Sequence, residues 1–310
     1  MNQPEIFEPG LILPVGTQVV TRAALKNANG EMLHPRGSVG VIVDVSSDQV
    51  QTYQVRFPTG GEALMKRQDF AVRKYLRQAT LQRLQGIDHT TLLAYVKYRC
   101  VVGSRAYGLD DDDSDTDRRG FYIAPPDLQW SLTGAPEQIE NHATQETYWE
   151  LQKFLMMALK ANPNVLECLY TPFVETRTDL ADELLAMRSI FLSRFVYQTY
   201  NGYVLSQFKK LEQDLRTKGA PRWKHAMHLI RLLLSGITVL TEGVVLVRVA
   251  EHRERLLAIK RAEMPWQEVN AWRLSLHHEF DRAFMESKLP DRPDFERADA
   301  FLIKARRSML

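Results

Sequence analysis

This chain of 310 residues has little cysteine, little net charge and no long apolar run. Its two cysteines, Cys100 and Cys168, are too few for a disulfide framework, and their apolar neighbours predict buried thiols. The 40 Lys and Arg residues nearly balance the 38 Asp and Glu residues. This balance excludes a nucleic-acid-binding protein with a uniformly basic surface, and it excludes a disordered acidic protein. The apolar runs fall short of the ~20 residues of a membrane span, and the first residues lack a secretory pattern. A cytoplasmic protein without a membrane partner is expected.

The first part of the chain is rich in short β-type runs. These runs are rich in Val, Thr, Tyr and Phe, and turn residues separate them. Such a pattern predicts a small, strongly bent antiparallel barrel similar to SH3-like or KOW-type barrels. Barrels of this kind bind RNA, DNA, peptides or a neighbouring domain, so the fold alone specifies no partner. The runs are Gly16–Val20, Gly37–Val45, Gln51–Phe57 and Glu62–Met65.

From Trp149 onward the apolar residues follow a helical period, after a shorter helical pattern at 73–84. The sequence Asn162-Pro163-Asn164 breaks the first of these later helices, and Asn164 with Glu167 fits a capping box. The expected domains are a barrel at 1–75, a core at 76–180 and a helical domain at 181–310. The last domain is expected to hold helices at about 180–195, 201–217, 223–242, 249–262, 265–288 and 294–306.

An acidic loop carries the densest charge in the sequence, because six of the eight residues from Asp110 to Asp117 are Asp. Like charges at this density repel one another, so the loop is either solvated or a metal site. An EF-hand is excluded because Thr116 occupies the position that requires Gly, and Tyr122 occupies the position of the bidentate Glu.

Asp115 and Asp117 suit a different kind of metal site. If they begin a strand, their side chains lie on the same face and can bridge paired Mg²⁺ ions. Upstream, Gly103-Ser104 ends a β-type run, and a glycine there lets backbone N–H groups approach phosphate oxygens. A phosphate-binding turn followed by a metal-binding acid pair indicates nucleotidyl transfer.

The Gly-Ser and Ser-Asp-x-Asp motifs resemble the signature of the DNA polymerase β-like nucleotidyltransferase superfamily. The chain is more similar to one branch, the predicted nucleotidyltransferases of bacteria and phages that include the RNA-ligase-associated type. The resemblance covers about residues 95–300 and implies an α+β fold, with a mixed-sheet core and a C-terminal helical domain. The segments that carry it are Gly103–Gly108, Ser114–Gly120, Leu151–Leu155, Asn162–Glu167, Lys224–Leu233 and Leu289–Asp294.

The resemblance also implies roles for individual residues. Gly103 and Ser104 would hold the phosphates of a nucleoside triphosphate, with Arg105 as a further contact. Asp115 and Asp117 would hold Mg²⁺ or Mn²⁺. Two other arginines, Arg118 and Arg119, are expected to offset the Asp charge by ion pairing.

The superfamily uses a third carboxylate on a later strand to activate the acceptor hydroxyl. Residues 137–150 contain no Asp, and their candidates are Glu140, Glu146 and Glu150. We favour Glu146 as the third catalytic carboxylate.

A basic helix is expected from Trp223, in which Lys224, His228 and Arg231 share one face. One hypothesis is that this face covers the cleft and binds the triphosphate. The alternative is a solvated face of a helix that is buried on its other side. His225 and His228 have no third ligand nearby in the sequence, which argues against zinc.

Two functions follow from these patterns. The first is a metal-dependent nucleotidyltransferase that moves a nucleoside monophosphate from an NTP to a hydroxyl and releases pyrophosphate. The acceptor would be an RNA end, a small molecule or a protein side chain, and the RNA-ligase association favours RNA. The alternative is a catalytically weak or inactive NTP-binding sensor whose barrel recruits a nucleic-acid or protein partner. The sequence specifies neither the NTP nor the oligomeric state.

Overall fold

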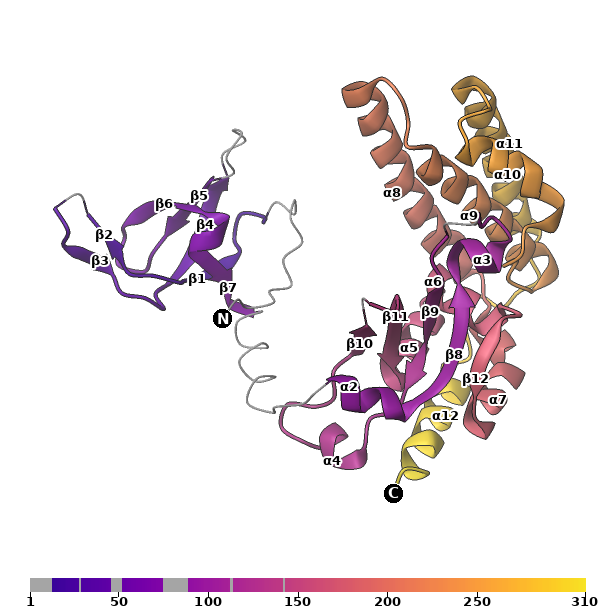
Figure 1. The fold of residues 1–310 in the computed structure, drawn as a ribbon, viewed down its shortest axis with the longest axis horizontal. Helices are drawn as coiled ribbons and strands as arrows, with labels where there is room; N and C mark the ends of the chain where they lie inside the picture. The colour runs from indigo at the N-terminus through magenta and orange to yellow at the C-terminus, as the bar shows by residue number, and fades with distance from the viewer. Residues whose placement is uncertain (1–12, 28, 46–51, 75–88, 112–113, 142) are drawn as a thin grey trace. The chain divides into compact units, whose positions relative to one another are not determined.

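The protein is described by a computed structural model that covers residues 13–27, 29–45, 52–74, 89–111, 114–141 and 143–310. It divides into two compact units, Met1–Ile87 and Asp88–Leu310, which are considered separately (Figure 1).

The first unit is an antiparallel sheet in the order β6-β5-β4-β1-β7, with a separate β2-β3 pair. Side chains from alternate positions, including Ile42, Tyr53 and Phe70, form its core. The described strands make an open sheet, so the closed SH3-like barrel is not confirmed. Its strands are β1 (Gln18–Thr21), β2 (Leu25–Lys26), β3 (Met32–His34), β4 (Val39–Val45), β5 (Thr52–Arg56), β6 (Glu62–Lys66) and β7 (Phe70–Val72).

The four strands expected in this unit are present, with ends shifted by a few residues. Strands β2, β3 and β7 were not expected, because a run of two or three residues is too short to show the alternation of apolar and polar residues that marks a strand. Of the helix expected at 73–84, only Arg73 and Lys74 are described, and they are helical; its remainder lies outside the described residues.

The second unit is built on a mixed sheet in the order β10-β11-β9-β8-β12. Strand β11 runs parallel to β9, and the other neighbours are antiparallel. The mixed sheet and the helices after it confirm the α+β class. The strands are β8 (Val96–Val102), β9 (Asp117–Tyr122), β10 (Gln138–Asn141), β11 (Glu146–Glu150) and β12 (Val174–Arg177).

Short helices connect and cover this sheet. The helix after Asn162 begins at Pro163, and the Asn162 side chain accepts a hydrogen bond from the Asn164 backbone N–H at 3.0 Å. The capping box expected from Asn164 and Glu167 is therefore wrong, because Asn162 is the N-cap residue. The helices are α2 (His89–Leu92), α3 (Gly103–Tyr107), α4 (Pro126–Gln129), α5 (Leu151–Leu159), α6 (Pro163–Tyr170) and α7 (Asp179–Ala186).

The C-terminal part is helical, and α9 lies at its centre with α8, α10 and α11 packed around it (Figure 1). One apolar core runs from the sheet through these helices to α12, which packs on α5. The boundary expected at residue 180 stays a prediction. The helices are α8 (Phe195–Lys218), α9 (Trp223–Glu242), α10 (Arg253–Lys260), α11 (Trp266–Glu286) and α12 (Phe295–Arg307).

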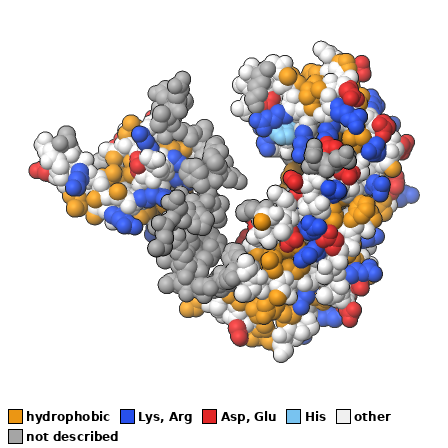
Figure 2. Space-filling view, viewed as in Figure 1, with side chains coloured by type: hydrophobic (Ala, Val, Ile, Leu, Met, Phe, Trp, Pro, Cys, Tyr) orange, Lys and Arg blue, Asp and Glu red, His pale blue; other side chains and the backbone are white. Residues whose placement is uncertain are grey.

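Two further expectations concern burial. Cys100 and Cys168 are fully buried free thiols, as predicted. In the described ranges, no helix combines the length and the apolarity needed to cross a bilayer. Figure 2 shows basic and acidic side chains interspersed over the visible face of the second unit, which agrees with the near-zero net charge.

Candidate functional site

The pairing of β8 and β9 brings the Gly-Ser motif beside the acidic motif. Val102, at the end of β8, pairs with Asp117, at the start of β9. Gly103 follows with φ +73°, and a Cβ atom at this position would lie 2.7 Å from Asp117 Oδ2. A side chain there would be strained and would displace the carboxylate. Glycine therefore lets the Asp117 carboxylate lie against the backbone where α3 begins.

Asp117 is the first residue of β9, whereas Asp115 precedes the strand, so the expectation that both acids begin a strand holds for Asp117 alone. Asp115 is exposed, and the Asp117 side chain is 35% exposed. Mg²⁺ is typically held by one or two carboxylates together with substrate phosphates and waters. Within the described residues, no group of three or more His, Cys, Asp or Glu could hold a metal alone. Two carboxylates alone would therefore need further oxygen ligands, such as phosphates and waters, to hold Mg²⁺.

Arginines offset part of the acidic charge. Arg119 Nη2 lies 3.3 Å from Asp117 Oδ1, in line with the pairing role expected for it. Arg118 pairs instead with Glu175 of β12 at 2.8 Å, so its partner lies outside the acidic loop. The exposed Arg105 donates a hydrogen bond to the Ser114 carbonyl at 2.6 Å, which closes the loop on α3.

A buried ionic network lies at the other end of α3. Arg231 of α9 is only 6% exposed, and its Nη1 lies 2.6 Å from Glu167 Oε1 of α6. The Tyr107 hydroxyl donates to Glu167 Oε2 at 2.6 Å, and the Arg231 guanidinium lies 3.7 Å from the centre of the Tyr107 ring. Burial raises the pKa of Tyr107, so the hydroxyl keeps the proton that it donates.

This network changes the role of Arg231. The sequence predicted a phosphate contact on an open helix face, but a buried guanidinium that is paired with Glu167 does not face a ligand. Its ion pair instead ties α3, α6 and α9 together. Tyr107, Glu167 and Arg231 come from three of the segments that carry the sequence resemblance, so these segments meet in one buried network.

The sequence that contains these motifs matches a known protein family. A family model described as the RNA repair pathway DNA polymerase beta family, RlaP, matches residues 63–304. This chain belongs to the RlaP family. The match confirms the resemblance inferred from the sequence, and membership in a polymerase β family indicates a nucleotidyltransferase. It spans β6, β7 and most of the second unit.

One curated relative shares part of the chain. The Uncharacterized protein YcgL of Bacillus subtilis (strain 168) is 30% identical over 102 residues. The alignment covers 32% of this chain and 39% of YcgL, so it spans well under two thirds of that relative. The name of YcgL states no activity, and the similarity therefore adds no substrate to what RlaP membership indicates.

The strand register places Glu146 away from the acid pair of this RlaP-family chain. Glu146 pairs with Arg118, and paired residues share a face of the sheet. Asp117 precedes Arg118 by one position, so its side chain lies on the opposite face. The choice of Glu146 as third catalytic carboxylate is therefore corrected by the register.

The other two candidate acids are also displaced from Asp117. Glu140 pairs with Thr147 and shares a face with Asp117, but β10 is two strands away from β9, or about 10 Å. Glu150 pairs with Tyr122 at the far end of β9. The β11 residue on the Asp117 face that lies nearest to Asp117 is Thr147, which pairs with Arg119 and is not acidic.

His228 also differs from its expected role. Burial and the nearby charges of Arg231 and Lys224 lower its pKa to about 3, so the imidazole is neutral at physiological pH. It packs edge-on against the Tyr107 ring, with the ring centres 6.4 Å apart. A neutral histidine does not offset phosphate charge, which leaves the exposed Lys224 as the cation of the predicted basic face.

The structure adds basic residues that the sequence did not indicate. Lys260 of α10 donates to the Leu109 carbonyl at 3.0 Å and pairs with Asp111 at 2.8 Å, although 149 residues separate the pair. The bond from Lys260 lowers the pKa of Asp111 to about 2. Arg253 donates to the Gly108 carbonyl at 2.8 Å. No local pattern marks these residues, because only the packing of α10 brings them to the acidic loop.

Proposed function

We propose that this chain is a metal-dependent nucleotidyltransferase that moves a nucleoside monophosphate from an NTP to a hydroxyl of RNA and releases pyrophosphate. The observation that carries the proposal is the contact of Gly103 with Asp117, in which a Cβ atom would meet the carboxylate at 2.7 Å. It supports a site in which phosphate-binding backbone and metal-binding acids adjoin. The RNA acceptor rests on the family description, RNA repair pathway.

Each residue at this site has a defined task in the proposal. Gly103 leaves the backbone open to phosphate oxygens, and Ser104 adds a hydroxyl donor. Asp115 and Asp117 would hold Mg²⁺ or Mn²⁺, which when bound stabilises charge on the phosphates of the NTP. Arg105 and Lys224 would contact the triphosphate and offset its charge.

No carboxylate that would activate the acceptor hydroxyl is evident beside Asp117 in the described residues. In β11, the position on the Asp117 face that lies nearest to Asp117 is Thr147, which is not acidic. This observation favours a second candidate function, an NTP-binding sensor that transfers slowly or not at all. The two functions share the nucleotide site and differ only in turnover.

One experiment separates these functions. The full chain is incubated with Mg²⁺ or Mn²⁺, each labelled NTP and single-stranded RNA, and labelled RNA and bound nucleotide are both measured. We expect transfer and binding that Asp115→Asn and Asp117→Asn abolish. The matched control Asp299→Asn, on the exposed face of α12, should change neither. Binding without transfer supports the sensor, and the absence of both contradicts the two functions together.

Adding a third carboxylate near Asp117 tests whether its absence limits the rate of nucleotidyl transfer. Thr147 shares the Asp117 face on the neighbouring strand, so Thr147→Asp would place a carboxylate on that face. We expect faster transfer with unchanged NTP binding. Glu146→Gln, on the opposite face, should leave the transfer rate near that of the wild type.

A further inference from the structure

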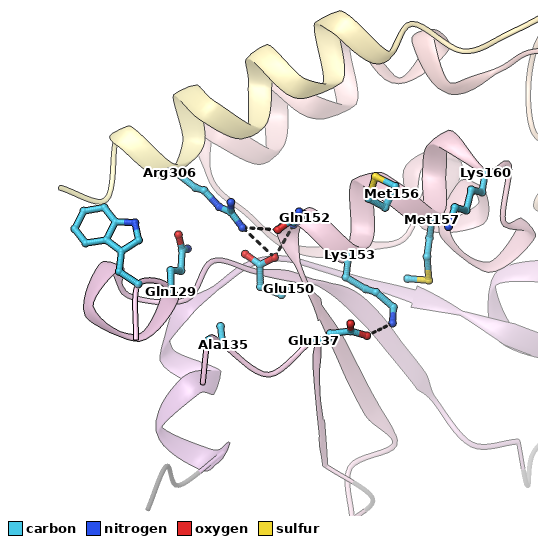
Figure 3. Close-up of a pocket in the computed structure, with 12 residues that line it drawn as sticks. Gln129, Ala135, Glu137, Glu150, Gln152, Lys153, Met156, Met157, Lys160 and Arg306 are labelled. Atoms are coloured by element: carbon cyan, nitrogen blue, oxygen red, sulfur yellow. Dashed lines mark hydrogen bonds and ion pairs between the residues drawn. The ribbon is translucent and has the colours of Figure 1, made fainter. Parts of the chain in front are cut away.

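A pocket lies at the far end of the sheet from Asp117. Its volume is about 600 Å³, within the range of small-molecule sites, and parts of α4, β11, α5 and α12 line it (Figure 3). Glu150 in this pocket pairs with Tyr122, the last residue of β9, whereas Asp117 is the first. Five steps along a strand are about 17 Å, so the two sites are separate.

The inner wall of the pocket holds an unpaired carboxylate oxygen. Glu150 is only 6% exposed, and its Oε2 accepts the Gln152 backbone N–H at 2.7 Å where α5 begins. Its Oε1 has no hydrogen-bond partner among the described residues. Buried carboxylate oxygens normally accept at least one hydrogen bond, so this oxygen is available to a hydrogen-bond donor of a ligand.

An unpaired donor lies beside this acceptor. Arg306 of α12 reaches over Glu150, and its Nη2 lies 2.9 Å from Gln152 Oε1 and 3.7 Å from Glu150 Oε2 (Figure 3). Its Nε has no partner within the described residues. Both unpaired atoms are buried, so a ligand reaches them when the Arg306 side chain, which is 36% exposed, turns outward. The pocket therefore offers an adjacent acceptor and donor, a pattern that the edges of nucleobases complement.

The outer part of the pocket suits the rest of a nucleotide. Trp130 at the end of α4 is 69% exposed and offers a flat aromatic surface, and Met156 of α5 adds an apolar contact. Bases stack on such aromatic rings with little sequence preference. Lys160, the residue after α5, also lines the pocket and supplies positive charge for a phosphate, whereas Lys153 is paired with Glu137 in the same lining (Figure 3).

We propose that this pocket binds one unpaired nucleobase of a single-stranded RNA. The base stacks on Trp130, donates a hydrogen bond to Glu150 Oε1 and accepts one from Arg306 Nε, while Lys160 contacts a phosphate. A mononucleotide does not reach across the ~17 Å between the sites, but a strand of several nucleotides does. The proposal rests on the proposed function in one respect, because it names single-stranded RNA as the acceptor class.

The test uses the full chain and a short oligoribonucleotide that carries one 2-aminopurine. Stacking on tryptophan quenches the fluorescence of this base, so titration gives both an affinity and a contact signal. Trp130→Ala, an exposed change, should weaken binding about 5- to 150-fold, the range that base–aromatic stacking supplies. Leu132→Ala is the matched control, because Leu132 is exposed nearby but does not line the pocket.

A second variant tests the inner wall. Glu150→Gln keeps the size of the side chain but replaces a carboxylate oxygen with an amide nitrogen or a weaker acceptor. It should weaken binding and leave the circular dichroism spectrum unchanged. Asp117→Asn should abolish nucleotidyl transfer without changing the affinity for the oligonucleotide, which separates a failure of this proposal from a failure of the proposed function.

Three results would overturn the proposal. The first is an affinity for the oligonucleotide that Trp130→Ala and Glu150→Gln leave unchanged, or no binding at all. The second is equally tight binding of a free mononucleotide, which makes the ligand a small molecule rather than a strand. The third is equally tight binding of fully paired RNA, in which no base is available for the pocket.

Discussion

Two sets of charged side chains flank the short helix α3, and their surroundings are opposite. At its N-terminal end, Asp117 lies beside Gly103, is partly exposed and contacts Arg119 at 3.3 Å, and the nearby Asp115 is exposed. At its C-terminal end, beside Tyr107, Glu167 and Arg231 are buried and bonded to each other at 2.6 Å. Carboxylates that remain exposed can take a ligand, whereas a fully paired buried carboxylate holds the fold together.

The largest expected effect comes from breaking the buried pair. Arg231→Ala leaves Glu167 charged and unpaired in the core, which should lower the free energy of unfolding by about 3–5 kcal/mol. Urea denaturation measures this change. Lys304→Ala is the control, because its exposed pair with Glu183 should contribute less than about 1 kcal/mol. Equal losses in the two variants would contradict the distinction between buried and exposed charges.

A smaller effect is expected at the glycine that adjoins the exposed acids. Gly103→Ala introduces a side chain at positive φ, which should cost about 1–3 kcal/mol, and it displaces Asp117. Gly219 has φ +72° with no atom within 4 Å of a Cβ position, so Gly219→Ala reproduces the strain without the contact. Both variants should be destabilised, as urea denaturation will show. Only Gly103→Ala should lose Mg²⁺-dependent NTP binding.

The buried side of α3 should also respond to pH. The folded-state pKa of His228 is lowered to about 3 from an ordinary value of 6.5, so the unfolded chain binds a proton that the native state does not. His228 therefore contributes stability above about pH 6.5, and this is lost as the pH falls toward 3, by at most about 1.4 kcal/mol per pH unit. Unfolding free energies at pH 7 and pH 5 should differ less in His228→Gln than in the wild type. A matching change in His278→Gln, on the surface, would contradict this assignment.

The smallest effect concerns the exposed loop. Lys260 holds the pKa of Asp111 at about 2, and Lys260→Met should raise it toward the ordinary value of about 3.9. NMR titration of the Asp111 carboxyl group measures the shift. Because Asp111 is exposed, we expect no measurable loss of stability at pH 7. An unchanged pKa would mean that Lys260 does not hold the loop in solution.

Local structure was largely predictable from the sequence. The helical period placed a helix at Trp223–Glu242, and α9 has these bounds. The β-type run that was expected to end at Gly103-Ser104 is β8, and the strand expected after the acidic loop is β9. These elements follow from the spacing of apolar residues within one segment, which the chain displays without reference to its partners.

The roles of side chains that depend on distant partners were not predictable. Lys224, His228 and Arg231 have helical spacing, but only the packing of α9 shows that Arg231 is buried and His228 is neutral. Glu146 stands close to the expected position in sequence, yet a difference of one residue in register places it on the other face of the sheet.

The sequence by itself determined the α+β class, the order of the motifs and the family to which they belong. These properties depend on residue identity and on spacings of a few residues. Only the tertiary structure decided which charges are paired, which are exposed and which acids share a face. Burial and charge pairing depend on contacts between segments far apart in the chain, and no local period encodes those contacts.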